Sequence, residues 1–262
     1  MPSNISPEEI EKLEHTYLEE FYHFLKFVER RMLAGFATKE KIKDDWEDKW
    51  DPNAEANERG ISSFAIGAER IVYALFNSQG FGQPNSAPVG SDLFFETPDA
   101  FIHIDLKTVQ TRNIGDYNTS IFVGDNQNSY KEKIKLKNGK VREYTQCALP
   151  FVYNNQGNKK PCLTFFFTIL YDEDTLDILN INMLCMPNGA LKTTYGSSVL
   201  KAGKNPGKIR FNFSEADEFK LLPAKPKRVK VVYFKEDMAD KFLKKLKYLN
   251  GLYQAQKNPK KD

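Results

Sequence analysis

The sequence predicts an α/β (α+β) protein in which a central β-sheet is flanked by helices. Two apolar patterns with the helical period lie in the first third of the chain, and after residue 90 the apolar residues alternate as in β-strands. The chain has 262 residues, 40% of them hydrophobic, which is enough to bury a sizeable core. Its longest apolar runs, such as Leu163–Tyr171, are far shorter than the roughly 18 residues of a membrane span. We expect a single domain over residues 1–262.

The N-terminal part of the chain is predicted to be an acidic helical subregion over residues 1–58. Ser6 and Pro7 are typical of a helix start, and aromatic residues at helical spacing extend the helix to about Leu33. Residues 38–58 are expected to form a short helix and a loop. Residues 1–58 carry a net charge of −7 and residues 59–262 a net charge of +10. The aromatic face either packs on its own domain or forms a dimer surface.

The remaining elements follow from the apolar period along residues 59–262, the body of the domain. A second helix is predicted over residues 61–76 because its apolar residues follow the 3, 4, 7 spacing. Strands are predicted at Ser91–Thr97, Ala100–Thr108, Cys162–Tyr171, Leu176–Met186, Ile209–Phe213 and Val229–Phe234. Residues 115–160 are expected to be polar and irregular, with a turn at Asn138-Gly139. Residues 191–208 are expected to form a loop, and Lys235–Leu252 a closing helix.

The cysteines and the N-terminus indicate a reducing compartment. Cys147, Cys162 and Cys185 form no C-x-x-C pair and no cluster with histidine, which excludes a zinc finger. An odd, widely spaced set of cysteines is typical of reduced thiols in a cytosolic protein. The first residues show neither the basic nor the apolar segment of a secretory signal. We therefore expect a cytoplasmic protein.

The predicted hairpin around Pro98-Asp99 contains the candidate catalytic and metal-binding side chains. If these two residues form the turn, the numbers of any two residues paired across the hairpin add up to 197. Asp92 then faces Asp105. One face of the hairpin is then apolar, and the other carries Asp92, Glu96, His103, Asp105 and Lys107. Two carboxylates placed opposite each other repel, and a divalent cation that binds oxygen ligands removes that cost. Lys107 lies on the same face as Asp105, so its ammonium group can reach a water or phosphate at the metal.

This hairpin resembles the active site of the PD-(D/E)xK nuclease superfamily. Asp92 matches the first acid of the family pattern, and Asp105-Leu106-Lys107 matches the D-x-K element on the next strand. Glu69 matches the glutamate that family members often carry on the preceding helix, although a salt bridge with a neighbouring base is the alternative. The sequence departs from the pattern because Ser91, rather than proline, precedes Asp92. The resemblance covers about residues 60–112 and implies a restriction-endonuclease-like core with a central mixed sheet.

The whole chain is similar in plan to the type II restriction endonucleases of this superfamily. The resemblance implies Mg²⁺ held by Asp92, Asp105 and the carbonyl of Leu106, with Lys107 orienting the attacking water and Glu69 at a second metal position. It also implies sequence-specific cleavage of double-stranded DNA, a homodimer and a cognate DNA methyltransferase. Two alternatives stay open, a structure-specific repair or resolvase nuclease of the same fold and a DNA-binding protein that does not cut.

Several polar segments are candidates for contacts with DNA. Cations and hydroxyl groups suit phosphate contacts, whereas amides read adenine edges, but solvated loops have the same composition. Lys131–Lys137 alternates like a strand with a lysine face, which is either a phosphate-contacting strand or a guarded sheet edge. Residues 179–213 contain no acid. The predicted DNA-binding residues are Thr108, Gln110, Arg112, Asn126, Gln127, Asn128, Lys192, Lys201, Lys204, Lys208 and Arg210.

Overall fold

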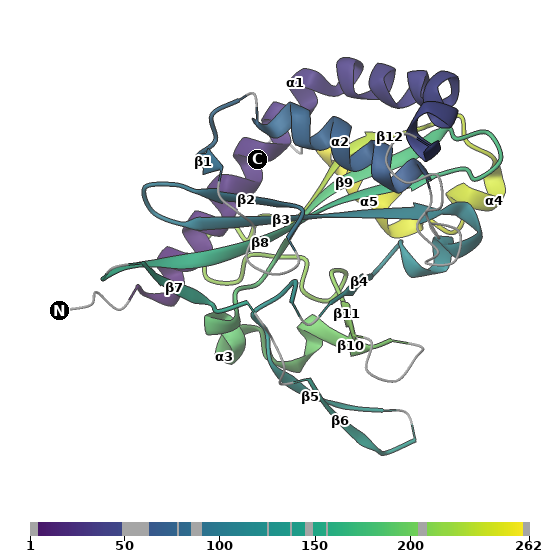
Figure 1. Cartoon of the computed structure of the whole chain (residues 1–262). Coiled ribbons are helices and arrows are strands. Elements are labelled where there is room, and N and C mark those ends of the chain that lie inside the picture. The colour runs from purple at the N-terminus through teal and green to yellow at the C-terminus, as the bar shows by residue number, and fades with distance from the viewer. Residues whose placement is uncertain are drawn as a thin grey trace.

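The computed structural model describes residues 5–48, 63–77, 79–84, 91–124, 126–136, 138–144, 149–155, 157–203 and 209–258. A mixed β-sheet forms its centre (Figure 1), in the order β1-β2-β3-β8-β9-β12, with β7 also paired to β8. The strands of this sheet are β1 (Gln83–Pro84), β2 (Leu93–Glu96), β3 (Phe101–Gln110), β7 (Val152–Asn155), β8 (Asn158–Tyr171), β9 (Ile178–Met186) and β12 (Val229–Phe234). The predicted fold class is therefore confirmed.

The two central strands of the sheet are buried on both faces. β3 and β8 run parallel, whereas the other pairs of the sheet are antiparallel. On one face Phe165 of β8 packs edge-on against Phe21, which belongs to helix α1 (Pro7–Asp48). On the other face Phe166 contacts Phe211 of β11 (Ile209–Phe211). The polar face of the predicted hairpin is consequently covered, because a second layer lies over it.

The hairpin of β2 and β3 has the predicted register. Leu93 pairs with Ile104, Phe94 with His103, and Glu96 with Phe101. The backbone N–H of Thr97 donates to the carbonyl of Ala100 over 2.9 Å and closes the Pro98-Asp99 turn. From α1, the Tyr17 hydroxyl bonds to Asp99 Oδ1 over 2.5 Å, so the first helix holds the tip of the hairpin in place.

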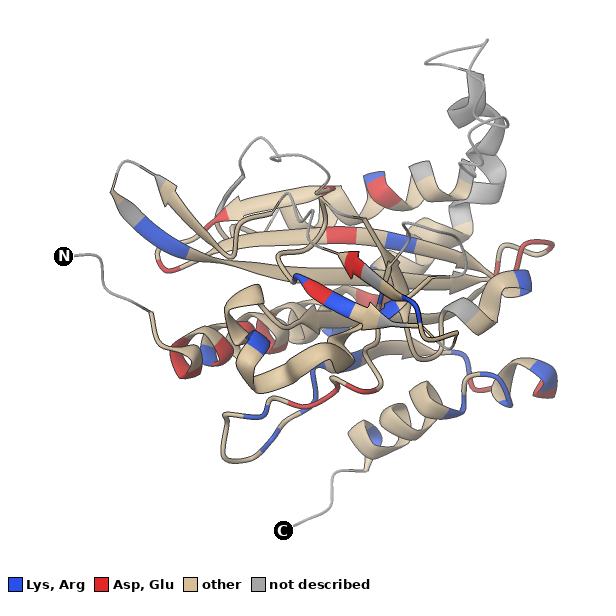
Figure 2. Cartoon of the chain, turned by 90° about the horizontal axis from the view of Figure 1, so that it is seen from below, with Lys and Arg blue, Asp and Glu red and all other residues tan. Residues whose placement is uncertain are grey.

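The first helix is longer than predicted, since α1 reaches Asp48 rather than Leu33. Its aromatic face packs on its own domain, with Leu18, Phe21 and Leu25 fully buried. Acidic residues lie on its first turns near the N-terminus (Figure 2). Helix α2 (Ser63–Asn77) covers the same face of the sheet, where Phe64 stacks on Tyr171 of β8. Residues 49–62, with part of the predicted loop, lie outside the described residues. None of the described helices is long and apolar enough to cross a membrane.

Two segments that the sequence predicts to be irregular or loop contain regular structure. Residues 115–160 are not irregular: their described part contains η1 (Thr111–Asp116), β4 (Ile121–Val123), β5 (Glu132–Lys135), β6 (Val141–Tyr144) and β7. Residues 191–203 form helical turns and a strand rather than a loop: η2 (Gly189–Leu191), α3 (Lys192–Tyr195), η3 (Gly196–Val199) and β10 (Leu200–Ala202). Leu191, Tyr195 and Val199 are buried at helical spacing, a signal that the glycines and serines between them obscure.

The closing helix is divided in two, α4 (Asp240–Leu243) and α5 (Lys247–Lys257). Its start is delayed because Lys235 still donates its N–H to Leu179 and so continues the strand pairing of β12. β10 and β11 pair with β4 in a small sheet, and β5 and β6 form a projecting hairpin (Figure 1). Gly139, in the predicted turn of that hairpin, has φ +81°, a left-handed conformation that glycine adopts without strain.

A buried ion cluster fastens α1 to the C-terminal half of the chain. Arg228 is fully buried, and its Nη2 lies 2.7 Å from Glu14 and 3.3 Å from Glu11. Glu11 also accepts the Tyr195 hydroxyl and the backbone N–H groups of residues 220–222. Glu11 and Glu14 thus have a cation and hydrogen-bond donors as partners within the chain, which is how buried charges are retained in folded proteins.

Candidate active site

The predicted acids lie on adjacent strands, at the centre of the sheet. Asp92 directly precedes β2, and Asp105 and Lys107 lie on β3. Since side chains of a strand alternate, Asp105 and Lys107 share one face. The backbone N–H of Leu106 donates to Asp92 Oδ2 over 2.6 Å, which fixes the Asp92 carboxylate across the hairpin and leaves Oδ1 for another partner.

Asp105 and Lys107 form a closed ring of contacts with Gln127, in the loop after β4. Lys107 Nζ lies 2.5 Å from Asp105 Oδ2, and it donates to Gln127 Oε1 over 2.8 Å. Gln127 Nε2 donates to Asp105 Oδ1 over 2.7 Å, and the N–H of Gly124 donates to Gln127 Oε1 over 2.8 Å. An ammonium group and a backbone N–H can only donate, so the amide oxygen faces them and the amide NH₂ faces Asp105.

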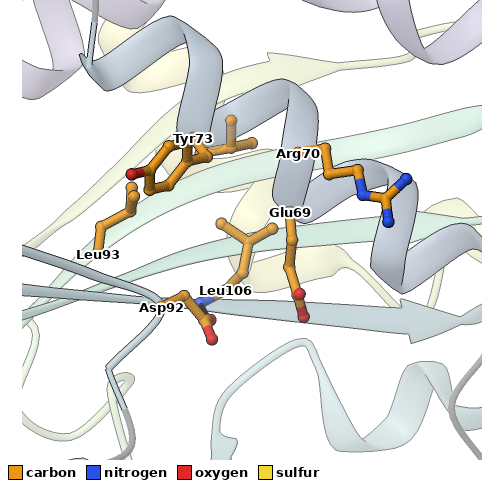
Figure 3. Close-up of a pocket in the computed structure, with 7 residues that line it drawn as sticks. Glu69, Arg70, Tyr73, Asp92, Leu93 and Leu106 are labelled. Atoms are coloured by element: carbon orange, nitrogen blue, oxygen red, sulfur yellow. Dashed lines mark hydrogen bonds between the residues drawn. The ribbon is translucent and has the colours of Figure 1, made fainter. Parts of the chain in front are cut away.

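Glu69 approaches this group from helix α2. A pocket of about 300 Å³ separates the helix from the hairpin, and Glu69, Tyr73, Asp92 and Leu106 are among the residues that line it. The carboxylates of Glu69 and Asp92 extend toward the same side of the pocket, whereas Arg70 points away (Figure 3). The alternative interpretation of Glu69 is a salt bridge with a neighbouring base. Among the described residues, Glu69 forms no ion pair.

Burial raises the pKa values of the three carboxyl groups, and nearby like charge adds to the rise at Asp105 and Glu69. Burial raises the pKa of Asp105 to about 7, with the neighbouring Asp92 and Glu69 adding to the rise and Lys107 opposing it. Partial burial, followed by the charge of Asp92, raises the pKa of Glu69 to about 6. Partial burial also raises the pKa of Asp92. Carboxyl groups with raised pKa values gathered at a pocket are typical of functional sites.

The carboxylate oxygens of this site suit a hard cation that keeps several of its water ligands. Asp105 Oδ2 is buried, and its partner among the described residues is the Lys107 ammonium group, at 2.5 Å. A cation that binds this oxygen would take the place of that ammonium group. No group of three or more His, Cys, Asp or Glu side chains within the described ranges is close enough to hold a metal ion alone. Mg²⁺ usually binds through one or two carboxylates plus waters, which suits so open a site.

The other polar residues of the hairpin are occupied elsewhere. His103 is 2% exposed, stacks on Tyr153, and lies 3.2 Å from its hydroxyl through Nε2. Burial lowers the pKa of His103 to about 3, so the imidazole is neutral. Glu96 forms an ion pair with Lys160 at 2.8 Å. The prediction that His103 is a packed or hydrogen-bonded side chain is confirmed.

The predicted DNA-binding residues on strands fall into two groups. Thr108 and Gln110 continue β3 beyond Lys107 and are partly exposed, and Arg112 is exposed in η1. Lys201 of β10 pairs in register with Arg210 of β11. The Arg210 guanidinium bonds to the hydroxyl and the carbonyl of Ser120, each over 2.9 Å.

The remaining candidates lie in loops and short helical turns. Lys192, exposed on α3, faces Glu132 of β5 at 3.4 Å. Asn126 is partly exposed, whereas Asn128 is fully buried and bonds to Gly124 and Tyr130. Lys204 and Lys208 lie outside the described residues. Gln127 contacts Asp105 and Lys107, an arrangement that the sequence does not reveal, because its amide-rich surroundings indicate base contacts equally well.

The chain is similar to known restriction enzymes over most of its length. Residues 7–175 match the N-terminal domain of the type II restriction enzyme MwoI, and residues 178–234 match the central domain of that enzyme. The restriction endonuclease BglI, bound to its DNA recognition sequence, has 16% sequence identity and a TM-score of 0.66, and the match covers 88% of this chain and 92% of that chain.

A second similar structure is the tetrameric restriction endonuclease SfiI bound to cognate DNA. It has 15% identity and a TM-score of 0.63, and the match covers 90% of this chain and 88% of that chain. At such identities the structural matches show the fold, whereas the two domain matches show the family. No curated protein sequence matches this chain.

Proposed function

Because this chain belongs to the family of the type II restriction enzyme MwoI and is a site-specific deoxyribonuclease, we propose that it cuts double-stranded DNA with Mg²⁺ at the carboxylates of β2 and β3. Asp92, Asp105 and the carbonyl of Leu106 would hold the ion, as in the PD-(D/E)xK superfamily. The observation that supports this proposal most directly is the buried Asp105 Oδ2, whose partner among the described residues is the Lys107 ammonium group alone.

In the proposed hydrolysis of the phosphodiester bond, Lys107 and Glu69 have different roles. The ion, when bound, would supply positive charge at the scissile phosphate and a water of lowered pKa. Lys107 orients the attacking water and stabilises the charge that develops on the phosphate, since its ammonium group is held inside the site. Glu69, with a pKa of about 6, accepts a hydrogen bond from water at the open side of the pocket.

DNA contacts and assembly complete the proposal. Thr108, Gln110 and Arg112 follow Lys107 along the chain and would lie near the cut strand, whereas Lys192, Lys201 and Arg210 would contact phosphates. We propose a homodimer built on residues 1–58, for which the outward-facing Phe27 of α1, 85% exposed, is the supporting feature. The single domain over residues 1–262 and a companion DNA methyltransferase belong to the same proposal.

Digestion of a long, fully sequenced phage DNA tests the cleavage proposal. We expect discrete bands with Mg²⁺ and intact DNA with EDTA or with Asp105→Ala. A smear would indicate a structure-specific or non-specific nuclease instead. Intact DNA with the wild-type protein but a shifted band in a binding gel would indicate a protein that binds without cutting. Normal cleavage by Asp105→Ala would refute the site.

A further inference from the structure

Gln127 joins the two β3 residues of the proposed site through separate atoms. Its Nε2 donates to Asp105 Oδ1, and its Oε1 accepts from Lys107 Nζ. We propose that Gln127 is a positioning residue of the cleavage site, which retains Lys107 when Asp105 gives its Oδ2 to a divalent cation. This inference rests on the proposed function, because it takes Asp105 and Lys107 to be the residues that serve cleavage.

The need for a second partner follows from the position of Lys107. Its ammonium group lies 2.5 Å from Asp105 Oδ2, the same oxygen that would ligate the cation. A cation at Oδ2 repels the ammonium group, and lysine has a long, flexible stem that can swing into solvent. The neutral amide oxygen of Gln127 is an acceptor that the cation does not occupy, so it keeps the ammonium group beside the phosphate.

The surroundings hold Gln127 in this orientation. The N–H of Gly124 donates to Oε1, which fixes the amide oxygen on the side of Lys107. The Nε2 bond to Oδ1 in turn fixes the rotation of the Asp105 carboxylate, so that Oδ2 faces Lys107. The Lys107 ammonium lies 5.8 Å from the ring centre of Phe122 and 6.0 Å from that of Phe166, which limits its other positions. The group is therefore organised before DNA arrives.

The loop that carries Gln127 provides a matched control. The Tyr130 hydroxyl, three residues further on, donates to the carbonyl of Gly196 and so ties the same loop to η3. Tyr130→Phe removes that bond without touching Asp105 or Lys107. Gln127→Met keeps the length of the side chain and removes its hydrogen bonds. Gln127→Glu keeps an acceptor for Lys107 and Gly124 but loses the donor to Asp105.

Two measurements on the full-length protein separate positioning from folding. Cleavage of a plasmid with one site gives kcat and KM, and thermal unfolding of the DNA-free protein over a series of Mg²⁺ concentrations gives the affinity for the ion. For Gln127→Met we expect kcat to fall about 10- to 100-fold with KM within about 2-fold, and the Mg²⁺ concentration at half-maximal stabilisation to rise about 10-fold. We expect Gln127→Glu to recover part of kcat, and Tyr130→Phe to lower Tm while it keeps kcat.

The outcomes distinguish this inference from the proposed function. Wild-type kcat and Mg²⁺ affinity in Gln127→Met would overturn the role of Gln127, while an inactive Asp105→Ala would still support the site. A change confined to KM would make Gln127 a DNA contact, and parallel losses in Gln127→Met and Tyr130→Phe would make its role structural. Cleavage by Asp105→Ala would remove the basis of both proposals.

Discussion

Replacement of Asp105 by asparagine is expected to stabilise the metal-free protein at pH 8. Asp105 is 4% exposed, and burial raises its pKa from an ordinary 3.8 to about 7. Ionising the folded protein therefore costs about three pH units at roughly 1.4 kcal/mol each, a ceiling near 4 kcal/mol. Asparagine stays neutral, but it removes the ionic partner of Lys107, which offsets part of the gain. We expect a net stabilisation of about 2 kcal/mol.

The pH dependence of this effect follows from the direction of the pKa shift. The unfolded chain ionises Asp105 near pH 3.8, whereas the folded chain does so only near pH 7. The stability contributed by the protonated group is complete below about pH 4 and is lost as the pH rises through 7. Urea unfolding in EDTA should show equal stability of Asp105→Asn and wild type near pH 4 and a more stable variant at pH 8. Added Mg²⁺ should stabilise the wild type more than the variant.

Two results would refute this reasoning. A variant less stable than the wild type at pH 8 would mean that Lys107 and Gln127 satisfy the ionised carboxylate fully. A stability difference of equal size at pH 4 and pH 8 would mean that packing, rather than charge, separates the two side chains. In either case a cation would not relieve repulsion between Asp105 and the carboxylates of Asp92 and Glu69.

Three further predictions concern the site, the core and the surface. The Mg²⁺ concentration for half-maximal cleavage should rise as pH falls below 7, by up to about 10-fold per unit, because Asp105 must lose its proton to bind the ion; a flat titration between pH 6 and 8 would contradict this. Arg228→Met should destabilise the fold by about 3–5 kcal/mol in urea unfolding, since it leaves Glu11 and Glu14 buried without their cation. Phe27→Glu should convert a dimer to folded monomers in sedimentation, and an unchanged sedimentation coefficient would place the interface elsewhere.

The hairpin was predictable because its determinants are local. A two-residue turn and strict alternation fix which residues pair, so the register of Leu93 with Ile104 follows from the sequence alone. The partner strand β8 was predicted as a strand, but its parallel placement beside β3 depends on contacts about 60 residues apart. Burial of the polar face, and with it the raised pKa of Asp105, depends on the layer that contains β11 and Gln127, which is also distant in sequence.

Gln127 and Arg228 show that contacts between side chains far apart in the sequence are likewise not predictable from it. Gln127 reaches Asp105 across 22 positions, and Arg228 reaches Glu11 across 217. No spacing rule connects such pairs, because the rules for helices and strands relate residues within a few positions of one another. The sequence therefore identifies Asp92, Asp105 and Lys107 as a candidate set, and it predicts a DNA contact for Gln127 rather than its bonds to two of them.

Glu11 and Asp105 are both buried acids, but the partners of their carboxylate oxygens differ. Both oxygens of Glu11 accept hydrogen bonds, from the backbone, Tyr195 and Arg228. Asp105 is buried to a similar extent, but the partner of its Oδ2 among the described residues is the Lys107 ammonium group alone. Donors already surround the oxygens of Glu11, whereas a cation at Asp105 would give Oδ2 a stronger partner and offset the repulsion of Asp92 and Glu69. This incomplete set of partners, rather than burial itself, sets Asp105 apart as the group that we propose to serve the reaction.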